Sequence, residues 1–515
     1  MTPSESAESA GRGGRLDSSS HIAGRLTPHV NQVIGRIPDW KGAFLFYEGG
    51  RPVVRRAEEL QSDLRKAVTL LRREGFQRGD RIGIVGANSY AWLLLDLACL
   101  ACGFVSVGFD PIHHRWKELQ SELGLRRTYE IPDGATPWQV LGVPPEDADD
   151  AGLLQGHAFG PDDIIGMKFT SGSTGETKAI ELKRKSVDDT LTNVQGMFHH
   201  GPGDKLLLFL PLYLNQQRFW IYSSLLFDHD AVVVQYRLAV MALRRERPTV
   251  VMGVPEFFTS LIKGFDPAVP EQKERFRELM GGNIRYLWTG SAPISLATLK
   301  AYEAMGMPLY QGYGMNETCI ISKNHPGQDR LGSVGKVVPS KSVRFDDEGQ
   351  ILVKSTHEVN VRYANVPADV SALTFRPDGY VATGDLGHLD ADGYLYVTGR
   401  VKDIVVLSSG RKVSPIPLEN RLEEAACIDK AVVFGSGQSH LTAVISAVPG
   451  TAHGDVEAVV ASVNARLPED ERIRKFLLAP EPLTRENGLL TSQFKVRRNA
   501  VWARYERELL ALYGA

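Results

Sequence analysis

The stretch Phe169-Thr170-Ser171-Gly172-Ser173-Thr174-Gly175-Glu176-Thr177-Lys178 decides how the rest of the chain is interpreted. Apolar residues 164–169 precede it and residues 178–182 follow it, so we expect a loop between two strands. Glycines let a backbone turn tightly and bring its N–H groups close to an anion, and hydroxyl groups add donors. Lys178 adds a positive charge. The loop groups that suit a polyphosphate belong to Thr170, Ser171, Gly172, Ser173, Thr174 and Gly175.

A second interpretation of this stretch is a Ser/Gly-rich surface turn. The strand-to-helix phosphate loop is excluded, because G-x-x-x-x-G-K-[ST] is absent and no helix start follows. The rest of the chain must therefore distinguish a phosphate-binding loop from a turn.

Composition limits the broad class of the protein. The chain has 515 residues, 43% of them hydrophobic and 23% charged, which indicates a globular protein of two or more domains. A formal net charge of -2 provides no field for general binding of nucleic acid or anionic membranes. The first residues are rich in Ser, Gly and Glu and lack an apolar segment, so we expect a disordered tail over residues 1–24, no signal peptide and a cytoplasmic location.

Helices and strands alternate after the tail. The order strand, helix, strand at residues 81–86, 90–101 and 104–109 is a βαβ pattern, which implies a parallel sheet. A second series of apolar strands is expected at residues 205–210, 231–235, 249–253 and 285–289.

After Gly335 the segments become short and alternating, as in β-hairpins, and beyond Gly399 a small α/β pattern returns. The predicted fold class is therefore α/β. Residues 25–399 form a large N-terminal domain of mixed and parallel sheets flanked by helices, with a β-rich subdomain. Residues 400–515 form a small, mobile C-terminal α/β domain.

Four further motifs follow the loop in order. They are Tyr310-Gln-Gly-Tyr-Gly-Met-Asn-Glu-Thr-Cys319, Thr383-Gly-Asp385, Gly399-Arg-Val-Lys-Asp403 and Glu486-Asn-Gly-Leu-Leu-Thr-Ser-Gln-Phe-Lys495. Their order and spacing resemble the adenylate-forming superfamily of acyl-CoA synthetases, peptide-synthetase adenylation domains and firefly luciferase, over residues 40–505. Details such as Gly332-Ser-Val-Gly335 are most similar to the long-chain acyl-CoA synthetases, although the span from Asp110 to Asp162 is shorter here.

The resemblance implies a role for each motif. Thr170 to Gly175 with Lys178 would hold the β- and γ-phosphates of ATP, and Glu317 would hold Mg²⁺. Asp385 and Arg400 would bind the ribose. The adenine site would be lined by Gly290, Ser291, Ala292 and Pro293, with Tyr313 of the Gly312–Gly314 segment stacked on the base.

The same resemblance gives Lys495 the central catalytic role. It would bridge the acid oxygen and the α-phosphate, where a placed ammonium stabilises developing negative charge. The acid becomes an acyl-adenylate with release of pyrophosphate, and a thiol or an amine, such as CoA or a carrier protein, then displaces AMP. The C-terminal domain would rotate about Lys402 between the two steps. Taken singly, Asp385 is also compatible with a turn residue, Arg400 with a surface ion pair and Lys495 with a solvated charge run.

Two departures from the family pattern concern the α-phosphate and the acid. Asn316 stands where the family usually has threonine, and it retains a donor for the α-phosphate. Leu214 stands where a histidine is common beside the acyl pocket, and polar residues follow it. We therefore expect a small polar or aromatic acid in a pocket of Leu214, Gln217, Arg218 and Gly312. The alternative is that these polar side chains face solvent.

Two other functions stay open at the level of sequence. Some relatives adenylate nitrous acid and diazotise an aromatic amine, which the polar pocket would permit. A non-catalytic nucleotide-binding relative is the third possibility, although the retained Glu317, Asp385, Arg400 and Lys495 argue against it.

Overall fold

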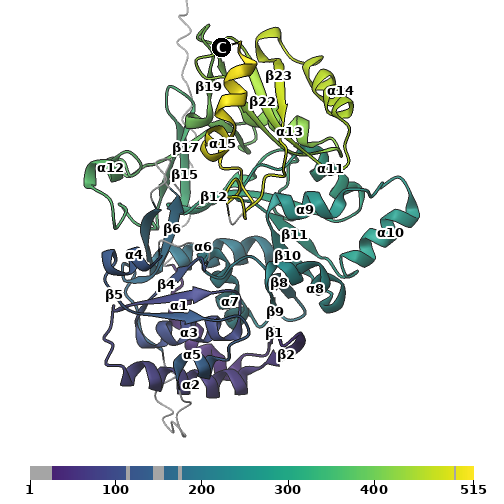
Figure 1. Cartoon of the computed structure of the whole chain (residues 1–515). Coiled ribbons are helices and arrows are strands. Elements are labelled where there is room, and N and C mark those ends of the chain that lie inside the picture. Colours follow the sequence, from purple (N-terminus) through teal and green to yellow (C-terminus); the bar gives the residue numbers. More distant parts are fainter. Residues whose placement is uncertain (1–25, 112–115, 143–155, 172–176, 492–493, 515) are drawn as a thin grey trace, which may run out of the picture.

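The computed structural model describes residues 26–111, 116–142, 156–171, 177–491 and 494–514. The predicted tail over residues 1–24 lies outside them. Two large sheets form the first part of the chain (Figure 1). The five-stranded sheet has the order β5-β3-β4-β6-β7, with β3 at Arg81–Gly86, β4 at Val105–Phe109, β5 at Leu125–Ile131, β6 at Ile164–Ser171 and β7 at Thr177–Lys183.

Strands β3 and β4 pair in parallel, and helix α3 (Tyr90–Cys102) connects them. Ser89 caps this helix by accepting a hydrogen bond from the backbone of Trp92, and Gly103 ends it in a left-handed conformation that glycine adopts readily. The amphipathic helix α2 (Ala57–Arg73) precedes β3 and packs on α3. The predicted βαβ unit is confirmed.

The second sheet has nine strands in the order β14-β13-β12-β11-β10-β8-β9-β1-β2. Its central strands β9, β8, β10, β11 and β12 are parallel, as the apolar runs predict, and both edges are antiparallel. The strands are β1 (Phe44–Glu48), β2 (Arg51–Arg55), β8 (Lys205–Leu208), β9 (Asp230–Val233), β10 (Val250–Gly253), β11 (Tyr286–Thr289), β12 (Leu309–Met315), β13 (Cys319–Lys323) and β14 (Lys336–Val337).

Alternating side chains give each sheet two buried faces. On β8, Leu206 and Leu208 join a core shared with the five-stranded sheet, whereas Leu207 joins a core on the opposite face. The shared core contains side chains from α1 (His29–Arg36), α3, α6 (Arg184–Phe198) and α7 (Asn215–Phe227). The opposite face is covered by α8 (Ala239–Glu246), α9 (Pro255–Ile262), α10 (Pro270–Leu279) and α11 (Leu296–Ala304). Helix α7 therefore lies between the two sheets.

The later part of the chain is smaller and richer in hairpins. An antiparallel sheet joins β15 (Lys341–Phe345), β16 (Gln350–Ser355), β17 (Val381–Leu389) and β18 (Leu395–Arg400). Beyond it, Figure 1 shows a compact unit at one end of the molecule. This unit has its own cores and consists of β21 (Ile428–Phe434), β22 (Leu441–Ala447), β23 (Ile473–Leu478), α13 (Pro415–Glu423), α14 (His453–Asn464) and α15 (Arg498–Leu512).

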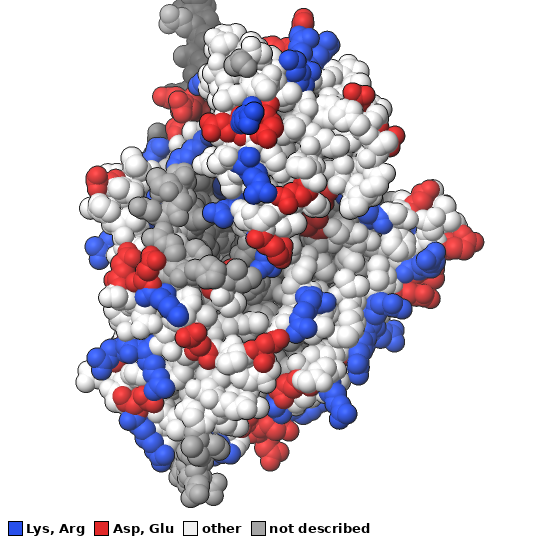
Figure 2. All heavy atoms as spheres, viewed as in Figure 1, with Lys and Arg blue, Asp and Glu red and all other residues white. Residues whose placement is uncertain are grey.

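The predicted α/β fold class is confirmed, with large sheets first and a small α/β unit last. The exact division at residues 399–400 stays a prediction. Acidic and basic side chains are interspersed over the described part of the face in Figure 2, in keeping with the small net charge. Among helices of the described residues, none has the length and apolar character of a membrane span.

Candidate active site

The Ser/Thr/Gly stretch begins and ends in the hairpin of β6 and β7. Thr170 pairs with Lys178 and Ser171 with Thr177, so the prediction of a connection between two strands is confirmed at both of its ends. The predicted anion-binding residues Gly172, Ser173, Thr174 and Gly175 lie outside the described residues.

Lys178 and Glu317 both contact the same tyrosine, Tyr363. The Lys178 ammonium lies 4.8 Å from the centre of the Tyr363 ring, and the Tyr363 hydroxyl donates a hydrogen bond of 2.8 Å to Glu317 Oε1. Burial raises the pKa of Glu317, and the Tyr363 hydrogen bond opposes that shift. The structure therefore brings the loop lysine and the predicted metal carboxylate together.

Strand β6 is also tied to the segment around Glu317. The Asn316 amide donates to the Phe169 carbonyl at 2.9 Å. Lys168, whose side chain is buried, donates to the Asn316 carbonyl at 3.3 Å and lies 2.9 Å from Cys319 Sγ. These contacts fix the predicted phosphate and metal groups relative to each other.

A second cluster surrounds Asp385, which is buried at the start of the β17–β18 pair. Asp385 accepts hydrogen bonds from the Tyr313 hydroxyl at 2.7 Å and from Arg400 Nε at 2.8 Å. Lys495 lies close enough to this pair for the charges of Asp385 and Arg400 to act on its pKa. Burial, together with the charge of Arg400, lowers the pKa of Lys495 to about 8, and Asp385 acts in the opposite direction.

The C-terminal unit carries Lys495 and docks on the large sheets. Phe494 packs on Tyr236 with ring centres 4.8 Å apart, and Lys430 of β21 forms an ion pair with Glu256 of α9. The predicted hinge residue Lys402 lies exposed in the short helix η4 (Val401–Asp403). The docked arrangement brings the predicted catalytic lysine to the Asp385 cluster.

The predicted adenine segment follows β11 directly. A Cβ at Gly290 would lie 3.2 Å from the Gly312 carbonyl oxygen, a tight contact that the absence of a side chain at position 290 avoids. Ser291 has a positive φ of 71°. Ala292 and Pro293 follow it at the partly exposed end of the strand. This close approach joins the predicted adenine segment to the Gly312–Gly314 segment.

Three of the four predicted acid-pocket residues lie at the start of α7, and the fourth, Gly312, lies on β12. Leu214 is the N-cap residue and is half-buried, while Gln217 is buried. The neighbouring Asn215 donates to the Met167 carbonyl of β6 at 2.8 Å, and Gln216 is exposed. The alternative of a solvent-facing loop is therefore excluded for Gln217.

Arg218 is paired within the fold. Its guanidinium forms an ion pair of 2.7 Å with Asp96 of α3 and donates to the Ser106 hydroxyl of β4. Asp96 also accepts from Tyr222 at 2.8 Å. Two other guanidinium nitrogens, Nε and Nη2, have no partner among the described residues. The charge of Arg218 is therefore balanced by Asp96, and its place in the acid pocket stays a prediction.

Sequence reasoning missed three residues that organise the site. Tyr363 has no motif around it, so nothing in the sequence links it to Glu317. Lys168 and Lys323 do carry a signal, since Lys168 is a charged residue within an apolar strand, Lys323 ends another such strand, and both are buried. Buried charges of this kind are rare and often functional.

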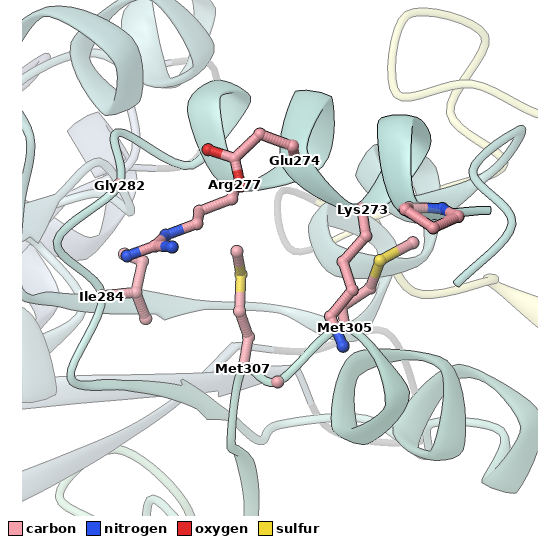
Figure 3. A pocket seen from close by; sticks show the side chains of 9 residues that line it. Lys273, Glu274, Arg277, Gly282, Ile284, Met305 and Met307 are labelled. Carbon is pink, nitrogen blue, oxygen red and sulfur yellow. The ribbon is translucent and has the colours of Figure 1, made fainter. Parts of the chain in front are cut away.

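A surface cavity of about 340 Å³ lies elsewhere (Figure 3). It is bounded by α10 and by the segments that lead into β11 and β12, and Lys273, Arg277 and Met307 contribute to its wall. None of its lining residues belongs to the predicted site. We therefore do not assign the chemistry to it.

Comparison with known proteins identifies the family. Residues 113–361 match the family model of AMP-binding enzymes, and residues 402–515 match the model of the AMP-binding enzyme C-terminal domain. The long-chain-fatty-acid–CoA ligase FadD15 of Mycobacterium bovis is 27% identical over 563 residues, covering 88% of this chain and 92% of that protein. The indoleacetate–CoA ligase of Aromatoleum aromaticum is 29% identical over 313 residues, covering 56% of this chain and 58% of that protein.

Solved structures share the fold. ATP-bound MatB from Rhodopseudomonas palustris superposes with a TM-score of 0.76 at 23% identity, covering 92% of this chain and 99% of that chain. The anthranilate–CoA ligase AuaEII in complex with anthranoyl-AMP has a TM-score of 0.75 at 18% identity, with 92% and 96% coverage.

Proposed function

Since the chain belongs to the family of AMP-binding, adenylate-forming enzymes and is an ATP-dependent, AMP-forming acid ligase, we propose that it activates a small polar or aromatic carboxylic acid. The acid carboxylate attacks the α-phosphate of ATP, an acyl-adenylate forms and pyrophosphate leaves. A thiol then displaces AMP. CoA is the proposed acceptor, because the similar proteins named above are CoA ligases.

The observation that carries this proposal is the position of Lys495. It belongs to a separate C-terminal unit, yet it lies close enough to Asp385 and Arg400 for both charges to act on its pKa, so a cation stands near a group suited to ribose hydroxyls. An ammonium at this point stabilises the charge that develops on the α-phosphate and the acid oxygen. We also propose that residues 400–515 rotate about Lys402 after this step, which would remove Lys495 and admit the thiol.

The site fits a magnesium ion that accompanies ATP. Mg²⁺ binds phosphate oxygens with one or two carboxylates and keeps several waters. Glu317 offers one carboxylate, and Lys178, whose ammonium lies over the Tyr363 ring, would meet phosphate. Within the described ranges, no three His, Cys, Asp or Glu side chains cluster as an all-protein metal site would require. When bound, the ion would offset phosphate charge, and Glu317 would orient it.

The proposed acid is small because two indole rings occupy the space between α7 and β11. Trp220 and Trp288 are both buried and pack edge to face with centres 5.3 Å apart. A Cβ at Gly290 would lie 4.0 Å from Trp288 Nε1, so this pair stands directly beside the predicted adenine segment. Indoles at this place favour a short or aromatic acid over a long alkyl chain.

Pyrophosphate release tests the proposal. The protein is incubated with ATP, Mg²⁺ and a panel of short, aromatic and long-chain acids, and the adenylate is trapped with hydroxylamine. We expect pyrophosphate and hydroxamate with short or aromatic acids. A preference for long-chain acids would contradict the proposed substrate class, and no release with any acid would contradict adenylation of carboxylates.

A parallel reaction contains nitrite and a panel of aryl amines in place of the acid. A nitrite-dependent azo or diazo product without any hydroxamate would replace the proposed ligase activity by diazotisation. Hydroxamate without a nitrite-dependent product would remove that alternative.

A further inference from the structure

Lys323 is a buried cation whose charge no described residue balances by contact. Its side chain is 1% exposed at the end of β13. The ammonium donates to the Tyr310 carbonyl at 2.7 Å and to the Thr289 carbonyl at 3.4 Å, and it lies 3.6 Å from the centre of the Trp288 indole ring. Within the described residues, no carboxylate lies within 4.0 Å of it. All its contacts are neutral.

Lys323 lies on the acid side of the proposed site. It pairs directly with Gly312 across β12 and β13, and residues opposite each other in an antiparallel pair share one face of the sheet. A Cβ at Gly312 would lie 2.5 Å from Lys323 Cδ and 3.3 Å from Nζ. The lysine stem therefore occupies the space that a side chain at position 312 would fill.

One polar atom without a described partner lies on the same pair of indole rings. The Trp220 indole N–H is buried and has no hydrogen-bond partner among the described residues, and its ring packs on Trp288. An indole N–H and an ammonium are both donors, so together they suit an acceptor-rich, negatively charged group.

A buried charge with only neutral contacts is unfavourable in the free protein. Burial lowers the pKa of Lys323 well below its usual value, with the charge of Asp329 acting in the opposite direction. An anion that enters beside Lys323 would supply the missing counter-charge. This energetic asymmetry between the free and the ligand-bound protein is the pattern of a binding residue and not of a stabilising one.

We propose that Lys323 receives the second anionic group of a short dicarboxylic acid whose first carboxylate is adenylated beside Lys495. The inference rests on the proposed ligase function and adds the substrate class to it. Lys323 acts on specificity: it positions and selects the acid, while Lys495 serves the reacting carboxylate.

The test compares each dicarboxylate with its monomethyl ester. Succinate, phthalate and their monomethyl esters are assayed for pyrophosphate release with the wild-type protein, Lys323→Met and Lys323→Arg. Lys336→Met is the matched control, because Lys336 stands opposite Lys323 on β14 and is only half-buried. Benzoate and hexanoate are included as acids with a single charge.

We expect the wild type to prefer the dicarboxylates. Lys323→Met should lower kcat/KM for them by about 30-fold or more, the scale for truncating one partner of a buried charge pair, mainly through KM. The monomethyl esters should change by less than about threefold, Lys323→Arg should restore part of the preference, and Lys336→Met should behave as wild type. Lys323→Met should unfold at the same or a higher temperature, because it removes an unbalanced buried charge.

Other outcomes overturn the inference in distinguishable ways. Wild-type activity on esters, benzoate or hexanoate that equals or exceeds activity on the dicarboxylates overturns the inference and leaves the ligase function intact. An unchanged dicarboxylate preference in Lys323→Met, or a parallel loss on every acid with a lower unfolding temperature, shows that Lys323 only ties β11 to β12. If Lys323→Met does not fold, the wild-type preference decides alone. No pyrophosphate with any acid overturns the ligase function and the inference together.

Discussion

The nucleotide side and the acid side of the site hold their charges in different ways. On the nucleotide side, Asp385 is shared by Tyr313 and by Arg400, whose side chain is 58% exposed. Lys495 arrives from another unit of the fold. On the acid side, Arg218 and Lys323 are both almost completely buried. Exposed charges are ready for a ligand that comes from solvent, whereas buried charges need a fixed partner within the fold or a bound one.

We therefore expect substitution of the two buried cations to have different effects. Arg218 has Asp96 and Ser106, so its charge is balanced before any substrate binds. Lys323 has only carbonyl oxygens and an indole face. Removing the first should damage the fold, and removing the second should damage selection of the acid.

The largest effect is expected from Arg218→Met. The substitution leaves Asp96 as a buried carboxylate without its cation, and we expect the free energy of unfolding to fall by about 3–5 kcal/mol. Urea denaturation measures this loss. The control Arg237→Met removes an exposed ion pair with Asp133 and should change the free energy of unfolding by about 1 kcal/mol or less.

A different result would break the comparison between the two cations. If Arg218→Met folds with wild-type stability but accepts different acids, then Arg218 faces the substrate after all. The distinction between a structural and a selecting cation would then disappear.

Lys495→Ala should have the next largest effect. Loss of a placed group that stabilises developing charge lowers the rate of pyrophosphate release by about 100- to 1000-fold. Because Lys495 acts on the reaction, binding of ATP measured by calorimetry should change little. The neighbouring exposed Arg497→Ala is the control and should retain activity. A fully active Lys495→Ala protein would overturn the proposed function.

The sequence was informative where interacting residues lie close together along the chain. The hairpin around the Ser/Thr/Gly stretch and the pairing of Asp385 with Arg400 across β17 and β18 both lie within short segments, where local patterns predict them. The parallel sheets followed from apolar runs separated by helices. The fold class and the pairing of Asp385 with Arg400 could therefore be predicted, and the nucleotide roles of these residues stay predictions.

The acid side could not be predicted in the same way. Arg218 meets Asp96 across 122 positions of the chain, and no periodicity in α7 reports whether its inward face meets substrate or another helix. On the nucleotide side the same holds for Tyr363 and Glu317, which are 46 positions apart and share no motif. Such contacts depend on the packing of whole sheets and helices, which only the three-dimensional structure shows.

The rate of adenylation should fall about tenfold when the pH is raised one unit above the pKa of Lys495. Lys495 must be protonated to stabilise negative charge, and its pKa is lowered to about 8. The rate should therefore be constant below this pH and fall by about tenfold for each pH unit above it. Lys495→Arg, whose side chain keeps its proton at these pH values, should lose the alkaline decrease. An unchanged decrease in Lys495→Arg would assign it to another group.

The smallest effect is expected from Glu256→Gln, which tests whether docking of the C-terminal unit supports the nucleotide side. The change breaks the ion pair with Lys430, which keeps Glu423 at 3.8 Å as a second partner. Loss of one partly buried pair should shift the docked population by about 1 kcal/mol, so adenylation should slow about fivefold. Transfer to the thiol, measured from a preformed adenylate, should not slow.

Glu469→Gln, which removes an exposed pair with Arg474 inside the C-terminal unit, is the control for both steps. Equal slowing of both steps would mean that Glu256 supports the fold and not the docked position of Lys495, because a contact specific to the docked state affects only the step performed in that state.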